Sequence, residues 1–125
     1  MKVIDNFLEQ DKFNFFKKEI TGEYFPWYFN NQKVLNDNHL DNFQFVNIFK
    51  DGNSATPLLD VFKEKLNVDS FKRAKLNCTT RTSEIFEFKL HNDLDEDCKI
   101  SIFYINSNNG YTKFETGEKV ESVEN

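Results

Sequence analysis

The triplet His91-Asn92-Asp93 carries two metal-binding side chains two residues apart. On an extended backbone, residues i and i+2 point to the same face, so the imidazole and the carboxylate converge. One further imidazole would complete a 2-His-1-carboxylate facial triad, the ligand set of non-haem Fe(II) oxygenases. Three ligands on one face leave the other positions open for a bidentate cosubstrate and dioxygen. The triplet therefore predicts two ligands of such a site.

The same spacing recurs at His39-Leu40-Asp41. This copy lies in residues 30–42, a polar stretch rich in Asn and Asp that is typical of a surface loop. No alternating pattern of apolar and polar residues surrounds it. We interpret it as solvated surface, which leaves His91 and Asp93 as the predicted ligands.

The elements that must position these residues follow an α+β order. Residues 2–4 predict a short strand, and residues 8–20 predict a helix that Gly22 ends. Pro26 favours an extended conformation over residues 24–29, before the loop at 30–42. The apolar residues near one face of the predicted helix are Leu8, Phe13, Phe16 and Ile20.

A strand and a second helix are predicted next. Residues 43–49 are aromatic and typical of a strand, and Asp51-Gly52-Asn53 is typical of a turn. Thr56 is expected to cap the following helix, with Pro57 at its first position. Its predicted buried stripe consists of Leu58, Leu59, Phe62 and Leu66.

The remainder of the chain predicts β-structure. Residues 73–79 and 85–93 alternate with period two, as strands do. Residues 98–106 and 111–115 are expected to form a hairpin around residues 107–110. Thr116-Gly117 predicts a further turn, and residues 119–123 the beginning of another strand. Two helices packed on a mainly antiparallel β-half are the expected architecture.

Length and composition restrict the class of protein. The 125 residues fit a single domain, residues 1–125. A net charge of −5 argues against nucleic-acid binding, which needs clustered cations. The sequence offers no membrane span and no signal peptide, so we expect a cytoplasmic protein. Cys78 and Cys98 are too few for a disulfide framework and are expected to be reduced core thiols.

Several spaced motifs carry a family resemblance. Residues 100–106 (ISIFYIN) followed by residues 110–114 (GYTKF) resemble the strand and hairpin after the metal motif of prolyl-4-hydroxylase-like 2-oxoglutarate/Fe(II) dioxygenases. Phe88 matches a frequent family aromatic three residues before the metal His. Residues 25–28 (FPWY) and 75–77 (KLN) are similar to small members from phage and marine bacteria. The resemblance covers nearly the whole chain and is strongest over residues 73–125.

The resemblance implies Fe(II) and 2-oxoglutarate as cofactors and assigns roles to individual residues. His91 and Asp93 match the first two metal ligands. Tyr104 matches a tyrosine that contacts 2-oxoglutarate, and Thr112 matches a hairpin position that lines the same pocket. Thr79 stands where many members carry a cosubstrate-binding Tyr. Asp93 points to hydroxylation, because halogenating members have a small residue at its position.

The resemblance also implies a fold and a deficiency. Residues 1–70 would form a helical support region, and residues 71–125 part of a jelly roll, or double-stranded β-helix. The family places its second metal His, and the Arg or Lys that pairs with 2-oxoglutarate, on strands that would follow Asn125. We therefore expect the N-terminal two thirds of an oxygenase fold, incomplete as an enzyme, with an open sheet edge that favours a homodimer. His39 and Glu87 are alternative third ligands from within the chain.

Two functions remain open. The leading hypothesis is a hydroxylase-type oxygenase domain that acts on a small molecule or a peptidyl side chain. The alternative is a non-catalytic interaction domain that keeps the oxygenase scaffold. The lack of a second metal His favours the alternative, whereas the presence of His91, Asp93 and Tyr104 favours the enzyme.

Overall fold

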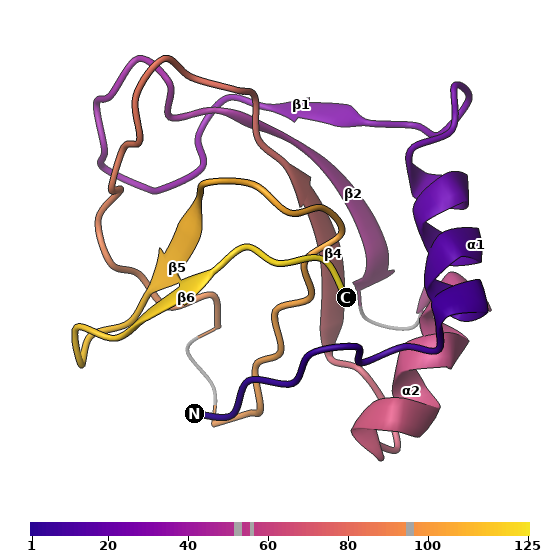
Figure 1. The fold of residues 1–125 in the computed structure, drawn as a ribbon. Coiled ribbons are helices and arrows are strands. Elements are labelled where there is room, and N and C mark those ends of the chain that lie inside the picture. Colours follow the sequence, from indigo (N-terminus) through magenta and orange to yellow (C-terminus); the bar gives the residue numbers. More distant parts are fainter. Residues whose placement is uncertain (52–53, 56, 95–96) are drawn as a thin grey trace.

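Figure 1 shows the computed structural model, which describes residues 1–51, 54–55, 57–94 and 97–125. These residues form an α+β arrangement of two α-helices, a 3-10 turn and short antiparallel strands, as expected from the sequence. The elements in chain order are α1 (Gln10–Ile20), β1 (Tyr28–Asn30), β2 (Gln44–Asp51), β3 (Ser54–Ala55), η1 (Pro57–Leu59), α2 (Asp60–Leu66), β4 (Arg73–Cys78), β5 (Tyr111–Lys113) and β6 (Lys119–Glu121).

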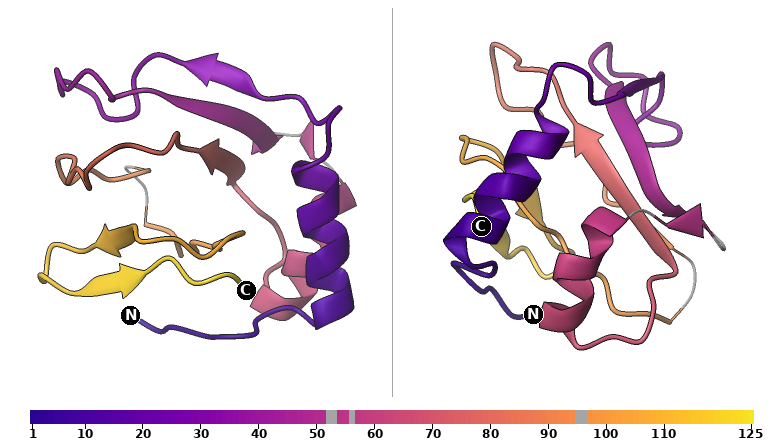
Figure 2. Two further views of the ribbon diagram at one scale, coloured as in Figure 1. Left: turned by 45° about the horizontal axis from the view of Figure 1, so that its top comes forward. Right: turned by 90° about the vertical axis from the view of Figure 1, so that its right-hand side faces the viewer.

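β2 is the central strand of the larger sheet and pairs antiparallel with β1, β3 and β4. The pairing with β4 places Phe45 opposite Cys78, and its register shifts between Ile48 and Lys50. β5 and β6 form a separate antiparallel hairpin. Both sheets extend to the same side of the two helices (Figure 2).

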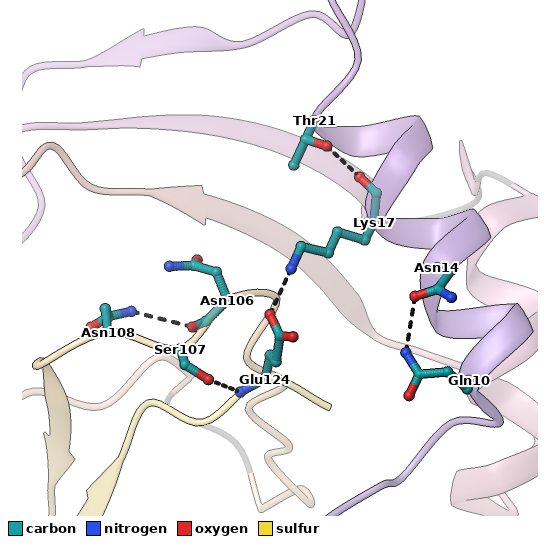
Figure 3. Close-up of polar contacts among 8 residues, drawn as sticks. All are labelled: Gln10, Asn14, Lys17, Thr21, Asn106, Ser107, Asn108 and Glu124. Carbon is teal, nitrogen blue, oxygen red and sulfur yellow. Dashed lines mark hydrogen bonds and ion pairs between the residues drawn. The ribbon is translucent and has the colours of Figure 1, made fainter.

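Helix α1 supplies one wall of the core. Its buried residues Phe13, Phe16 and Ile20 recur at the spacing of one helix face. The helix ends where the Thr21 hydroxyl donates a hydrogen bond of 2.7 Å to the carbonyl of Lys17 (Figure 3). The helix predicted over residues 8–20 is thus confirmed, with its first turn beginning at Gln10 rather than Leu8.

Aromatic rings join the helices to the β-half. Phe16 packs edge-on against Phe62 of α2, with ring centroids 5.0 Å apart, and against Phe49 of β2 at 6.2 Å. Phe103 lies 4.9 Å from Phe62 and also contacts Phe7, Phe13 and Phe16. Phe103, together with Ile105, therefore joins segment 97–110 to the core.

The end of the chain packs against its beginning. The Asn125 side chain accepts a hydrogen bond from the backbone N–H of Leu8 at 2.8 Å and donates one to the Leu8 carbonyl at 2.9 Å. The Lys17 ammonium lies 2.6 Å from the Glu124 carboxylate (Figure 3). These contacts hold residues 124 and 125 against α1 and the residue Leu8 that precedes it.

Several predicted elements are confirmed. β2 and β4 occupy the strands predicted at residues 43–49 and 73–79, and β6 begins at the predicted residue 119. Gly117, with φ of +87°, lies in the predicted turn between β5 and β6. The second helix begins as the 3-10 turn η1 at Pro57 and continues as α2. The predicted cap Thr56 and the turn at Gly52-Asn53 lie outside the described residues.

Three predicted strands are wrong. Residues 2–4, 85–93 and 98–106 form no strand in the described structure. Residues 85–93 alternate as strands do, but a strand also needs a partner backbone, and none of the described strands pairs with any of the three segments. Alternation indicates which side chains would share a face of a strand, but it does not indicate whether a second strand is there to pair with it.

The hairpin predicted around residues 107–110 is also wrong. Asn108 and Gly110 exchange backbone hydrogen bonds of 3.0 Å with Ser122, which follows β6, rather than with residues 98–106. The Asn108 side chain accepts a bond of 2.7 Å from the Gly110 N–H and tightens this turn. This turn thus precedes β5, and β5 pairs with β6 after the following turn at Thr116-Gly117.

The cysteine prediction is half right. Cys78 and Cys98 are free thiols, as expected. Cys78 is exposed and Cys98 half-buried, so the expectation that both lie in the core is wrong. In the described part of the chain, neither helix has the length and apolar character needed to cross a membrane.

Candidate functional site

His91 and Asp93 lie on residues 79–94, which cross the molecule without forming a helix or strand. Both side chains are exposed. His91 Nδ1 lies 3.2 Å from the carbonyl oxygen of Lys89. A carbonyl oxygen only accepts, so Nδ1 would be the donor in this contact, which is the tautomer that leaves Nε2 to a metal ion.

Asp93 has a different partner. Its Oδ1 lies 3.4 Å from the Arg73 guanidinium at the start of β4. Lys75, two residues further along β4, has its pKa lowered by burial and by Arg73, an effect that Asp93 opposes. The Asp93 carboxylate, a predicted metal ligand, therefore already contacts the positively charged start of β4. A metal ion would have to compete with Arg73 for this carboxylate.

The described residues do not complete a metal site. They contain no group of three or more His, Cys, Asp or Glu side chains that could hold a metal ion. One imidazole and one carboxylate fit part of the donor chemistry of Fe(II), and a third protein ligand is lacking among the described residues. We therefore derive no reaction step through a metal.

Glu87, one alternative ligand, is engaged elsewhere. Its carboxylate accepts hydrogen bonds from the Tyr111 hydroxyl, from the Lys113 ammonium at 2.6 Å and from the Lys119 ammonium at 2.9 Å. These hydrogen bonds lower the pKa of Glu87 to about 2, and the one from Lys113 contributes most, ahead of those from Tyr111 and Lys119. Tyr111 and Glu87 in turn raise the pKa of Lys119. These contacts tie segment 79–94 to the hairpin, and the structure does not place Glu87 with His91 and Asp93.

His39, the other alternative ligand, packs on aromatic rings. Its imidazole lies 4.1 Å from the ring of Phe86 and 5.9 Å from that of Phe88, measured between centroids. Its Nδ1 accepts a hydrogen bond of 3.1 Å from the Asp41 N–H. His39 thus joins the loop 31–42 to segment 79–94, and it is not brought together with His91 and Asp93.

A buried asparagine shapes this loop. The Asn42 amide accepts from the Val34 N–H at 2.8 Å and donates to the carbonyls of Val34 and Asp37 at 2.7 Å each. The loop surrounds an open polar hollow of about 460 Å³. Its lining includes Asp37, Asn42 and His39, the alternative third ligand, but not His91, Asp93 or the predicted cosubstrate residues.

Two of the predicted cosubstrate residues meet. The Tyr104 hydroxyl lies 2.6 Å from the Thr112 hydroxyl, and the contact is partly buried. Because side chains alternate along a strand, Thr112 points to the opposite face of β5 from Tyr111 and Lys113. Thr112 thus faces Tyr104, while its two neighbours face Glu87.

Thr79, the third predicted cosubstrate residue, directly follows β4 and is exposed. The described hydrogen bonds do not join it to Tyr104 or Thr112. The structure therefore brings together two of the three residues assigned to 2-oxoglutarate.

The cluster around Glu87 was not predicted as a site. Part of this cluster could be predicted from the local sequence, because Lys113 and Lys119 flank the Thr116-Gly117 turn and are opposite each other in the hairpin. Glu87 lies 26 residues before Lys113, and nothing in its surrounding sequence indicates that partner.

No family model, no curated protein and no solved structure matches this chain. The resemblance to prolyl-4-hydroxylase-like dioxygenases therefore depends on the sequence motifs alone.

Proposed function

We propose that this chain is a 2-oxoglutarate- and Fe(II)-dependent oxygenase domain of the hydroxylase type, related to the prolyl-4-hydroxylase-like dioxygenases. The observation that carries the proposal is the 2.6 Å contact between Tyr104 and Thr112. The motifs assign both residues to one cosubstrate pocket, although they lie on different segments.

The His91 environment supports the same proposal. A metal-binding His commonly donates its second ring N–H to a carbonyl or carboxylate, which orients the ring toward the metal. The contact between His91 and the Lys89 carbonyl has this arrangement. His91 and Asp93 would provide two metal ligands, and the third would come from outside the described residues.

The proposal includes four finer expectations. The antiparallel sheets of the β-half would belong to a jelly roll, the domain would be cytoplasmic, and an open strand edge would favour a homodimer. The substrate would be a small molecule or a peptidyl side chain.

Titration with Mn(II), a redox-stable surrogate for Fe(II), tests the proposal. Mn(II) binding would be followed by electron paramagnetic resonance without oxygen, with and without 2-oxoglutarate. We expect 2-oxoglutarate to strengthen binding, because it adds two ligands to the metal. His91→Ala should weaken binding by about tenfold or more.

His39→Ala is the matched control, because it removes the other His with an Asp two residues later. Its Mn(II) affinity should stay within about twofold of the parent chain. Absence of binding by the parent chain, or equal binding by His91→Ala, would contradict the oxygenase proposal.

The second candidate is a non-catalytic interaction domain that keeps the scaffold. The ion pair between Arg73 and Asp93 favours it, because the candidate ligand already has a partner. Arg73→Gln distinguishes the two candidates. In an oxygenase-type site, release of Asp93 should strengthen Mn(II) binding, whereas in an interaction domain neither form should bind Mn(II).

A further inference from the structure

We propose that the β5–β6 hairpin carries a carboxylate-binding site formed by Tyr111, Lys113 and Lys119, and that Glu87 occupies it as an internal ligand. A small organic carboxylate would bind there when Glu87 leaves. This site is separate from the proposed metal and cosubstrate positions, because Tyr111 and Lys113 face away from Thr112.

The pairing register creates a need for an anion. Lys113 and Lys119 are directly opposite each other in the hairpin. Like charges at directly opposed positions destabilise a pair of strands. A carboxylate between the two ammonium groups removes this repulsion, and Glu87 lies there in the structure, at 2.6 Å and 2.9 Å from the two nitrogens.

All three donors belong to the hairpin itself. The Lys119 ammonium also lies 4.0 Å from the centroid of the Tyr111 ring, a cation–π contact that holds the two side chains together. The backbone ladder of β5 and β6 therefore brings the donors together whether or not Glu87 is present. Two ammonium groups and one phenol suit an acceptor with two oxygens, which is the chemistry of a carboxylate.

The occupant lies on a less constrained part of the chain than the donors. Glu87 belongs to residues 79–94, which form no helix or strand. The side chains of Glu87 and Lys113 are each 40% exposed, and that of Lys119 is 46% exposed. A carboxylate in solution can therefore reach the ammonium groups once Glu87 moves away.

Other acids of the hairpin do not take this place. The Glu118 carboxylate lies 3.0 Å from the Thr116 hydroxyl, in the turn. Glu121 is opposite Tyr111 in the strand register, two pairs along the hairpin from the lysines and on the same face. The ion pairs described for Lys113 and Lys119 are those with Glu87.

Removal of Glu87, followed by addition of acetate, tests the proposal. In Glu87→Ala the site is empty, and acetate should raise the melting temperature by about 3 °C over sodium chloride at equal ionic strength. The parent chain should respond equally to both salts. Glu84→Ala, which removes an exposed carboxylate three residues away, should behave like the parent.

The location of binding is tested by nuclear magnetic resonance. Acetate should shift the amide signals of Tyr111 and Lys119 of Glu87→Ala to saturation. The shifts should disappear when Lys113→Gln is added. If Glu87→Ala does not fold, Glu87→Gln keeps the side-chain shape, removes the charge and should show the same preference for acetate. Equal effects of acetate and chloride on the folded variant, or shifts that survive the loss of Lys113, would overturn the proposal.

Discussion

The hydroxyls of Tyr104 and Thr112 depend on each other, so their removal should not be additive. They lie 2.6 Å apart in a partly buried contact, which is a close hydrogen bond between hydroxyls. A hydrogen bond of this kind contributes about 1 kcal/mol to stability. Tyr104→Phe or Thr112→Val alone should cost about that much, because each leaves one hydroxyl without its partner. The double substitution should cost about as much as either single one.

Urea unfolding followed by circular dichroism measures this double-mutant cycle. The coupling free energy should be about 1 kcal/mol, which is above the additivity error of about 0.3–0.5 kcal/mol. Thr82→Val combined with Tyr104→Phe is the matched control. Thr82 has a hydrogen bond of its own, to the Glu84 carbonyl at 2.6 Å, and no described bond to Tyr104, so this pair should be additive. Coupling within error for Tyr104 and Thr112 would refute the contact and would remove the main support for the oxygenase proposal.

Three further predictions concern the packing and the charges. Phe103→Ala, which removes a ring in contact with four others, should cost about 3 kcal/mol in urea unfolding. Ile102→Ala is the control, because Ile102 is 52% exposed, and it should cost less than about 1 kcal/mol. If Phe103→Ala and Ile102→Ala destabilise the protein equally, the placement of segment 97–110 is contradicted. Asn42→Ala leaves the Val34 N–H and the carbonyls of Val34 and Asp37 without their partner and should lower the free energy of unfolding by about 2–3 kcal/mol. A thermal melt unchanged by this substitution would show that loop 31–42 does not depend on the Asn42 amide. The pKa of Glu87 is lowered from 4.5 to about 2 in the folded state, so its contribution to stability is complete above pH 4.5 and lost as the pH falls toward 2. The urea midpoint of the parent chain should therefore fall more steeply over this interval than that of Glu87→Gln, and parallel curves would contradict the contacts with Lys113 and Lys119.

The elements that the sequence predicts well are those whose signal is local. The period of Phe13, Phe16 and Ile20 predicts which face of α1 is buried, because a helix satisfies its own backbone hydrogen bonds. β2 is predicted from its aromatic composition and β4 from alternation, and each pairs with the other. Residues 85–93 alternate in the same way and form no strand, because a strand depends on a distant partner that the pattern does not encode.

The same distinction applies to the candidate site. His91 and Asp93 are two residues apart, so their proximity follows from the sequence. The ion pair between Asp93 and Arg73 spans twenty residues and depends on how segment 79–94 crosses β4, which no local pattern predicts. The resemblance assigns Tyr104 and Thr112 to one pocket, and their hydroxyls lie 2.6 Å apart, a contact that no local pattern in the sequence predicts.

The alternation in residues 86–88 has a physical role even without a strand. Phe86 and Phe88 contact His39, and the Lys33 ammonium lies 4.1 Å from the centroid of the Phe88 ring, so both rings face loop 31–42. Glu87, between them, faces the β5–β6 hairpin. Apolar and charged residues must alternate here because the segment lies between an aromatic contact on one side and two ammonium groups on the other. The pattern that predicts a strand therefore records two different neighbours, and side-chain contacts rather than a backbone ladder hold this part of the chain in place.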